Sequence, residues 1–197
     1  MSINQNKKSS IAINMSLKQN LASYLNGIIT NRLFLILVFI GLTALASKIA
    51  VPIKPVPFTL QTMVVLLSGA LLGKRDGFYS QIAFLALGSI GVPVFTTLAD
   101  GTFGFASLFG PTGGYLLAFP IAAFLTGAII EKSHTYFSII TVLTLSEILI
   151  LLSGVLFLNT FYIKDFSISF QLGGSLFILW TVAKIVFATI IVKKFKK

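Results

Sequence analysis

Side chains that could act as acid, base, nucleophile or metal ligand are sparse in this chain. It has no cysteine and a single histidine, His134, so thiolate metal sites and cysteine nucleophiles are excluded. No spacing predicts an acid–base pair among its five acids, which are Asp76, Asp100, Glu131, Glu147 and Asp165. A nucleotide-binding motif is also missing, so any ATP dependence would have to come from another chain. The sequence therefore predicts no enzyme, no catalytic or metal site and no cofactor.

Two charged side chains nevertheless lie inside long apolar runs. Glu147 stands about ten residues from one end of the run 137–161, and Lys184 about nine residues from one end of the run 171–192; at about 1.5 Å per residue, each lies roughly 15 Å deep. Charges at such a depth are costly and mark a paired partner or a function. Two compatible interpretations stay open: a structural ion pair between Lys184 and Glu147, and a role of Lys184 at a substrate.

A third polar feature follows a stiff loop. Prolines at 52, 55 and 57 fix φ and remove backbone donors, so the segment 51–57 is predicted to be an extended loop rather than a helix. Gln61 comes directly behind it, at the entry of the next apolar run. A buried glutamine needs a partner, so Gln61 either bonds to another helix or meets a ligand.

The elements that position these residues are membrane helices. The chain is 56% hydrophobic with a mean hydropathy of +0.97, which is too apolar for a soluble domain. An all-α membrane protein is therefore predicted, with a polar cytoplasmic segment 1–31 followed by a six-helix membrane domain 32–197. The six predicted spans are Leu33–Val51, Phe58–Gly73, Gly77–Val92, Gly113–Ile130, Phe137–Phe161 and Gln171–Val192.

The distribution of basic residues predicts the orientation. Cytoplasmic loops collect Lys and Arg, and one side of the predicted spans holds most of them, including Arg32, Lys74, Arg75, Lys132 and the C-terminal lysines. The other side holds only Lys48, Lys54 and Lys164. Both termini are therefore predicted to be cytoplasmic. This topology and contact with anionic membrane lipid explain the net charge of +10, and nucleic acid is not predicted as a partner.

A long glycine-rich loop, 91–115, is predicted on the outer side. An irregular segment at membrane depth is tolerated only where protein covers it or where it lines a cavity. Gly113 and Gly114 open the next helix, so their N–H groups are candidates to face an anion or a carbonyl oxygen.

Four motifs together resemble one family. The segments PIKPVPFTLQT, SGALLGKRDG, ALGSIGVPVF and LFGPTGGYLLAF, which begin at Pro52, Ser68, Ala86 and Leu108, are similar to those of BioY, the biotin-binding S component of energy-coupling factor (ECF) transporters. The resemblance implies a six-helix fold with biotin held near the outer face. It also implies a transmembrane T component and a pair of ATPases as partners, at the cell membrane.

The resemblance also implies substrate-binding residues. Gln61, Tyr115 and Lys184 match positions that the family uses in or around its pocket. The family's last helix places an aspartate three residues before the lysine, whereas this chain has Thr181 there. Thr181 is therefore predicted to accept one weaker bond from the ligand, and Glu147 is the candidate to supply the missing carboxylate. Trp180 is predicted as an aromatic wall of the pocket.

The sequence leaves two other functions open. The loss of the acid at Thr181 is compatible with an S component or stand-alone carrier for a biotin precursor or another small carboxylate vitamin. A membrane-embedded enzyme would require Glu147 and Lys184 to be reactive and reached by solvent.

Overall fold

A computed structural model describes residues 15, 27, 31–97, 101, 103–175 and 178–196. Its contacts divide the chain into two units, Met1–Leu35 and Ile36–Lys197. Most of the predicted polar segment 1–31 lies outside the described residues. The account below concerns the second unit and the helix that enters it.

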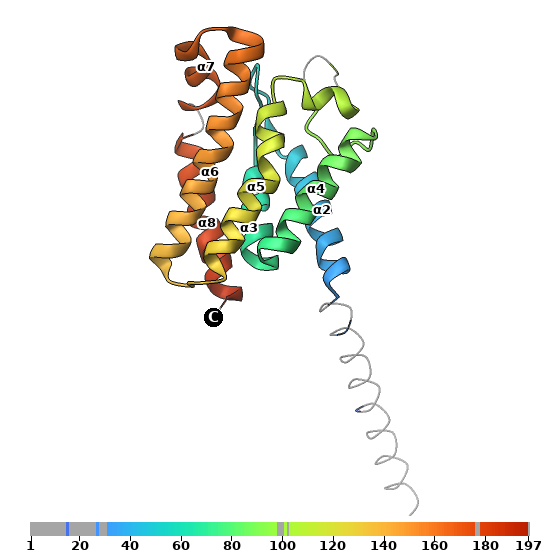
Figure 1. Ribbon diagram of the computed structural model, residues 1–197, viewed down its shortest axis with the longest axis vertical. Helices are drawn as coiled ribbons and strands as arrows, with labels where there is room; N and C mark the ends of the chain where they lie inside the picture. Colours follow the sequence, from blue (N-terminus) through green and yellow to red (C-terminus); the bar gives the residue numbers. More distant parts are fainter. Residues whose placement is uncertain are drawn as a thin grey trace, which may run out of the picture. The chain divides into compact units, whose positions relative to one another are not determined.

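The described chain is mainly helical (Figure 1). Two short strands and a 3-10 helix, η1, interrupt the helices, and a one-turn π-helix, η2, extends α6. The elements in order are α2 (Arg32–Lys48), β1 (Ala50–Val51), β2 (Phe58–Thr59), α3 (Gln61–Leu72), α4 (Lys74–Ser89), η1 (Gly104–Leu108), α5 (Gly113–Ile130), α6 (Tyr136–Leu158), η2 (Asn159–Ile163), α7 (Phe166–Gly173) and α8 (Ile178–Phe195).

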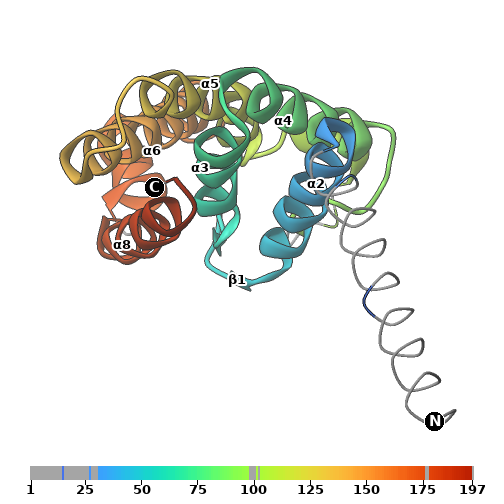
Figure 2. The ribbon, with the colours of Figure 1, turned by 90° about the horizontal axis from the view of Figure 1, so that it is seen from below.

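The helix α3 is central and short. It packs against α4, α5, α6 and α8, and the view along the helices shows it among them (Figure 2). The sequence predicts a helix from Phe58, but the three prolines and the antiparallel pairing of β1 with β2 delay its start to Gln61. With 12 residues α3 is about 18 Å long, well short of a bilayer core of about 30 Å. The Pro-rich loop 52–57 is not helical, as predicted.

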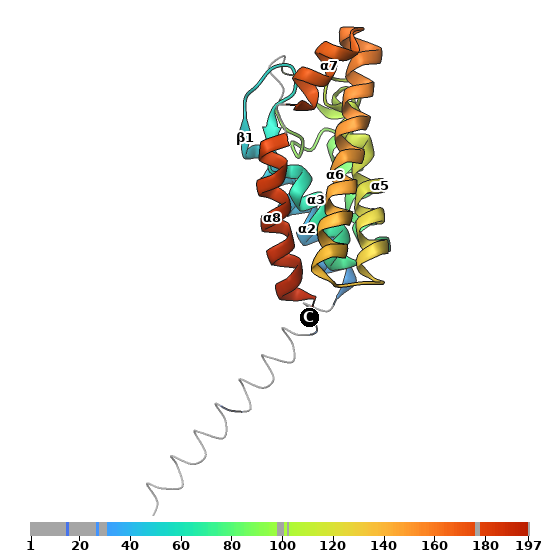
Figure 3. The ribbon, with the colours of Figure 1, turned by 90° about the vertical axis from the view of Figure 1, so that its left-hand side faces the viewer.

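Two other predicted boundaries are wrong. The turn between α3 and α4 is a single residue, Gly73, whose φ of 87° lies in the region that favours glycine, so α4 begins at Lys74 rather than Gly77. The predicted span 171–192 is divided between two helices, α7 and α8. The side chain of Asp165 caps the start of α7 by accepting from the Ile168 N–H, and α7 ends at Gly173 (Figure 3).

The length of the helices limits how many resemble membrane spans. Among the described residues, two helices are long and apolar enough to cross a bilayer by length and composition: Gly113–Ile130 and Tyr136–Ile163. The helices α2, α3 and α4 have 17, 12 and 16 residues, and α8 carries three lysines. Helix length and composition alone therefore do not support the predicted count of six spans.

Glycines bring α3, α4 and α5 into backbone contact. A Cβ atom at Gly69 would lie 2.0 Å from the Ala123 carbonyl oxygen, and one at Gly77 would lie 2.6 Å from the Gly69 Cα. A Cβ atom at Gly127 would lie 2.4 Å from the Lys74 nitrogen. Small residues at helix contacts are typical of membrane bundles, in which close packing replaces the hydrophobic driving force.

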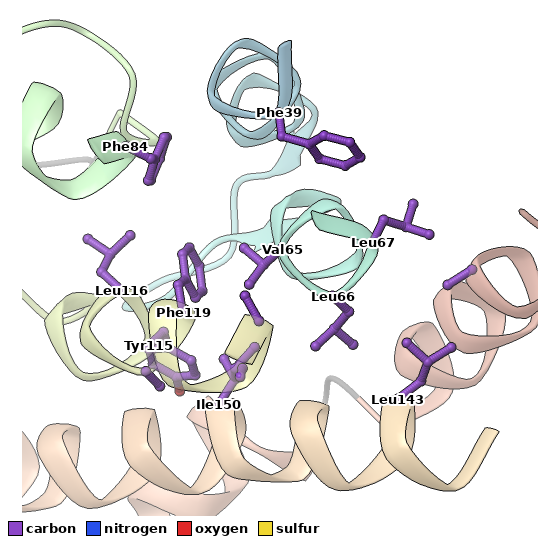
Figure 4. Packing of buried hydrophobic residues seen from close by; sticks show 14 of the residues in the cluster. Phe39, Val65, Leu66, Leu67, Phe84, Tyr115, Leu116, Phe119, Leu143 and Ile150 are labelled. Carbon is purple, nitrogen blue, oxygen red and sulfur yellow. The ribbon is translucent and has the colours of Figure 1, made fainter. Parts of the chain in front are cut away.

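The buried core lies where α3, α5 and α6 meet. Val65 and Leu66 of α3 point towards α5 and α6, where Phe119 and Ile150 lie (Figure 4). Phe84 of α4 lies across from Phe119, with ring centroids 6.5 Å apart. The short helix α3 is therefore held at its centre by apolar packing, and its N-terminal end is left for other partners.

The close contact at Gly69 yields a test of this packing. Gly69→Ala should destabilise the purified protein in detergent by about 1–3 kcal/mol, because the new methyl group meets the α5 backbone rather than a movable side chain. Gly41→Ala in α2 is the matched control, since a Cβ atom there would meet nothing within 4 Å. Thermal unfolding of both variants measures the effect, and equal unfolding temperatures for the two would contradict the contact.

Candidate functional site

The candidate site lies at the N-terminal end of the short helix α3. A narrow pocket there has a free volume of about 40 Å³, room for a few water molecules. It is lined by the Pro-rich loop 52–57 between β1 and β2, by the start of α3, by the loop after α4 and by the first turns of α5. The lining residues are Val56, Pro57, Thr59, Gln61, Thr62, Phe95, Thr96, Thr112, Tyr115, Leu116 and Phe119.

The wall that follows α4 is tied to the end of α2. Ser47 Oγ donates to the Val94 carbonyl oxygen at 2.8 Å, and Lys48 Nζ donates to that of Phe95 at 2.6 Å. Thr96 Oγ1 returns a bond of 3.0 Å to the Ser47 carbonyl oxygen. These bonds explain how a loop without regular structure keeps Phe95 and Thr96 at the pocket.

The wall from α5 is fixed by Tyr115. Its hydroxyl donates to the Gly173 carbonyl oxygen at the end of α7, at 2.7 Å. Its ring packs on Gly154 of α6, where a Cβ atom would lie 2.2 Å from the ring carbons. The motif GPTGGY thus joins three helices at the pocket. Of the two partners expected for the Gly113 N–H, an anion or a carbonyl oxygen, the structure shows the second: this N–H donates to the Gly110 carbonyl oxygen at 2.8 Å.

A buried charged network adjoins the pocket. Lys184 Nζ lies 2.6 Å from Glu147 Oε1, and both side chains are almost fully buried. Lys184 Nζ also donates to Thr62 Oγ1 at 2.5 Å, and Thr62 Oγ1 donates to Glu147 Oε1 at 2.9 Å. Since Thr62 lines the pocket, the network connects α6 and α8 to the pocket through the second residue of α3.

Two polar atoms at this end of α3 have no hydrogen-bond partner in the described part of the chain. Gln61 Nε2 is a donor and Glu147 Oε2 is an acceptor, and both are buried. A buried polar atom without a partner costs about 1–3 kcal/mol. Such a donor and acceptor next to one pocket are therefore suited to a ligand that offers both an acceptor and a donor.

The structure separates the other predicted residues from this group. Thr181 Oγ1 reaches Glu147 Oε1 at 3.4 Å, but Thr181 lines a different cavity, between α6 and α8. Trp180 is 41% exposed and is not among the residues that line the pocket. Of the residues predicted to bind substrate, Gln61 and Tyr115 line the pocket. Lys184 and its predicted partner Glu147 both bond to Thr62, which lines the pocket.

Two polar residues were missed by the sequence analysis. Thr62 joins pocket and ion pair, and its signal was the polar run TLQT at the start of an apolar segment. Gln81 is fully buried in α4, where its Nε2 lies within 3.4 Å of the hydroxyls of Thr43, Ser68 and Ser80. A glutamine in the middle of an apolar run was the signal, and here it holds three helices together.

Comparisons with known proteins show what this chain is similar to. The model of the BioY family matches residues 12–197. A probable biotin transporter BioY from Pyrococcus horikoshii is 38% identical over 160 residues, covering 81% of this chain and 93% of its own length. The biotin transporter BioY of Thermotoga maritima is 34% identical over 160 residues, covering 81% of this chain and 92% of its own.

A solved structure is also similar. The crystal structure of the S-component for biotin from an ECF-type ABC transporter superposes with a TM-score of 0.72 at 30% identity, covering 88% of this chain and 93% of that one. The relatives are transporters rather than enzymes. Because the family model matches almost the whole chain and relatives above 30% identity cover most of it, the chain belongs to the BioY family.

Proposed function

We propose that this chain is the substrate-binding S component of a biotin uptake transporter. It captures biotin at the outer face of the cell membrane, and a transmembrane T component with a pair of ATPases drives import. The proposal rests on membership of the BioY family and on the similarity to an S-component for biotin. The observation that carries it is the buried donor and acceptor, Gln61 Nε2 and Glu147 Oε2, beside the pocket.

The chemistry of biotin fits these atoms. Its ureido group has one carbonyl acceptor and two N–H donors, so Gln61 Nε2 would donate to the carbonyl oxygen while Glu147 Oε2 accepts from an N–H. Phe95, Tyr115 and Phe119 supply apolar walls for the ring and chain. Lys184 holds the Glu147 carboxylate in place, and Thr181 supports the same carboxylate. A contact between Trp180 and the ligand stays a prediction, since Trp180 does not line the pocket.

The free volume of the pocket is too small for biotin in this conformation. About 40 Å³ holds a few waters, whereas small-molecule sites are typically about 300–1,000 Å³. Binding therefore requires the pocket to widen. Phe95 and Thr96, which also line the pocket outside any helix, are tied to α2 by hydrogen bonds, so we propose that the Pro-rich loop 52–57 moves away from α5 when biotin enters.

The topology in this proposal is six membrane helices, α2, α3, α4, α5, α6 and α8, with both termini cytoplasmic. The α3–α4 turn, the α5–α6 turn and the end of α8 lie at one end of the bundle (Figures 1 and 3). That end carries Lys74, Arg75, Lys132, Lys193 and Lys194, and the other end carries Lys48, Lys54 and Lys164. The excess of basic residues supports the first end as the inner one, which puts the pocket on the outer side.

A second function remains in competition. The aspartate that the BioY resemblance places at position 181 is replaced by Thr181, which supports a carrier for a biotin precursor or another small carboxylate vitamin. Equilibrium binding distinguishes the two. The purified chain in detergent should bind labelled biotin tightly, and vitamins without a ureido ring should compete poorly. A folded, monodisperse sample that does not bind biotin would exclude the first function and favour the second.

The two buried glutamines provide a paired test of the site. Gln61→Leu should raise the unfolding temperature of the ligand-free protein, because a buried donor without a partner is removed. The same change should weaken biotin binding by about tenfold, which is the loss of one hydrogen bond. Gln81→Leu is the matched control: its amide nitrogen contacts three hydroxyls, although its Oε1 has no partner among the described residues, so this change should lower stability. If Gln61→Leu left biotin affinity unchanged, Gln61 would not contact the ligand.

The ion pair can be tested by removing its charges one at a time. Lys184→Met and Glu147→Gln should each destabilise the protein by about 3–5 kcal/mol, because each leaves a buried charge without its partner. The double variant should recover part of that stability but not biotin binding. Unfolding and biotin binding are measured on all three proteins. Recovery of both properties in the double variant would mean that the pair is structural only.

A further inference from the structure

A long apolar groove separates α6 from α8. On α6 it is lined by Ile140, Thr144, Ile148 and Leu151, which are spaced by about one helical turn and form a single stripe. The facing stripe of α8 runs from Thr181 to Ile190. The space between the two stripes is about 640 Å³. Their side chains therefore do not fill the space between helices that run side by side (Figure 3).

Such a volume is not expected to stay empty. Protein interiors are close-packed, with few voids larger than a water molecule, and apolar cavities take up apolar molecules rather than water. If α6 and α8 span the membrane, as proposed above, the groove faces lipid. Seven of its ten lining residues are Ile, Leu or Val, three are threonines, and none is the glycine or alanine that allows the closest approach of a second helix. A flexible hydrocarbon chain fits these stripes better than a helix does.

One end of the groove opens at a cluster of basic residues. Tyr136 lies one turn before Ile140, and Lys193 lies three residues beyond Ile190. Lys193 Nζ stands 4.5 Å from the centre of the Tyr136 ring and donates to the His134 carbonyl oxygen at 2.9 Å. Lys194 and Lys132 are exposed nearby in the sequence.

The acid near this end is already neutralised. Glu131 accepts from the Lys74 backbone N–H at 2.9 Å, and its Oε2 lies 3.2 Å from Lys74 Nζ. The mouth of the groove therefore carries a net positive charge.

We propose that this groove is a binding site for one anionic phospholipid of the inner leaflet. Its acyl chain lies between α6 and α8, and its phosphate headgroup meets Lys193 and Lys194 beside Tyr136. Two observations support this proposal: the groove is apolar along its length, as an acyl chain requires, and one of its ends is positively charged. It goes beyond biotin binding and rests on the membrane location and orientation in the proposed function.

The site has a structural connection to the charged network. Thr181 lines the far end of the groove and also bonds to Glu147 Oε1. Lys184 and Glu147, the two halves of the ion pair, come from α8 and α6, the two helices that the lipid would hold apart at a fixed spacing. The lipid thereby supports the distance across which this pair forms.

Native mass spectrometry of the full chain, delipidated in detergent and without biotin, tests the proposal. Titration with phosphatidylglycerol should give one saturable adduct with a single lipid molecule. Phosphatidylcholine should form the same adduct only at a higher lipid concentration. Ile148→Trp, which fills the groove, should weaken both adducts. Lys193→Gln should lower the affinity for phosphatidylglycerol by about fivefold, the effect of one lysine, and leave the affinity for phosphatidylcholine unchanged.

Two controls match these variants. Ile121→Trp on α5 changes an isoleucine that is exposed but does not line the groove, and Lys164→Gln changes a lysine at the opposite end of the bundle. Neither should alter lipid binding. If Ile148→Trp fails to fold, Val186→Trp on α8 fills the same groove.

Three results would overturn the proposal. The two lipids could form adducts at the same concentration, lipid binding could survive in the groove-filling variant, or the protein could be a dimer that this variant converts to monomers. The last result would assign the groove to a second copy of the chain. Because the readout is lipid retention, failure here leaves biotin binding untouched.

Discussion

The short helix α3 is the constraint on which the arrangement of this protein depends. It occupies the centre of the bundle, yet its 12 residues are too few to fill the depth of a membrane. Prolines before it and Gly73 after it set this length. The space beyond its N-terminal end is enclosed by the hairpin, the loop after α4 and the start of α5, and that enclosed space is the pocket. Irregular backbone at this depth is stable because protein covers it, as the burial of Val56 and Phe58 shows.

The N-terminal end of α3 also explains how a charged pair can be buried beside it. The helix dipole gives this end a partial positive charge, which favours the carboxylate of Glu147. Thr62 donates to that carboxylate and accepts from Lys184, so the charges share one hydroxyl as well as a direct contact. A buried ion pair is weak evidence for stability by itself, since its desolvation offsets much of its attraction. The unpaired Glu147 Oε2 supports the proposal that the pair holds a carboxylate for a ligand.

Several of these features could be predicted from the sequence, for identifiable reasons. The Pro-rich loop was predictable because proline acts locally, and Lys184 and Glu147 were conspicuous because charges are rare in apolar runs. The start of α8 was not predictable, since hydropathy does not distinguish the surface helix α7 from the span that follows it. The position of Thr181 also required the structure. Its side chain lines the space between α6 and α8, and no spacing along the chain states which face of a helix meets which neighbour.

The buried carboxylate beside Lys184 comes from a different helix than in the BioY pattern. In the BioY pattern that the last helix resembles, the acid and the lysine stand three residues apart, so their separation is fixed by a single helix. In this chain the acid is Glu147 of α6 and the base is Lys184 of α8, and their contact depends on how the two helices are spaced. Between the same two helices lies a groove that their own side chains do not fill. The spacing of α6 and α8 therefore sets both the contact of the charged pair and the width of this groove.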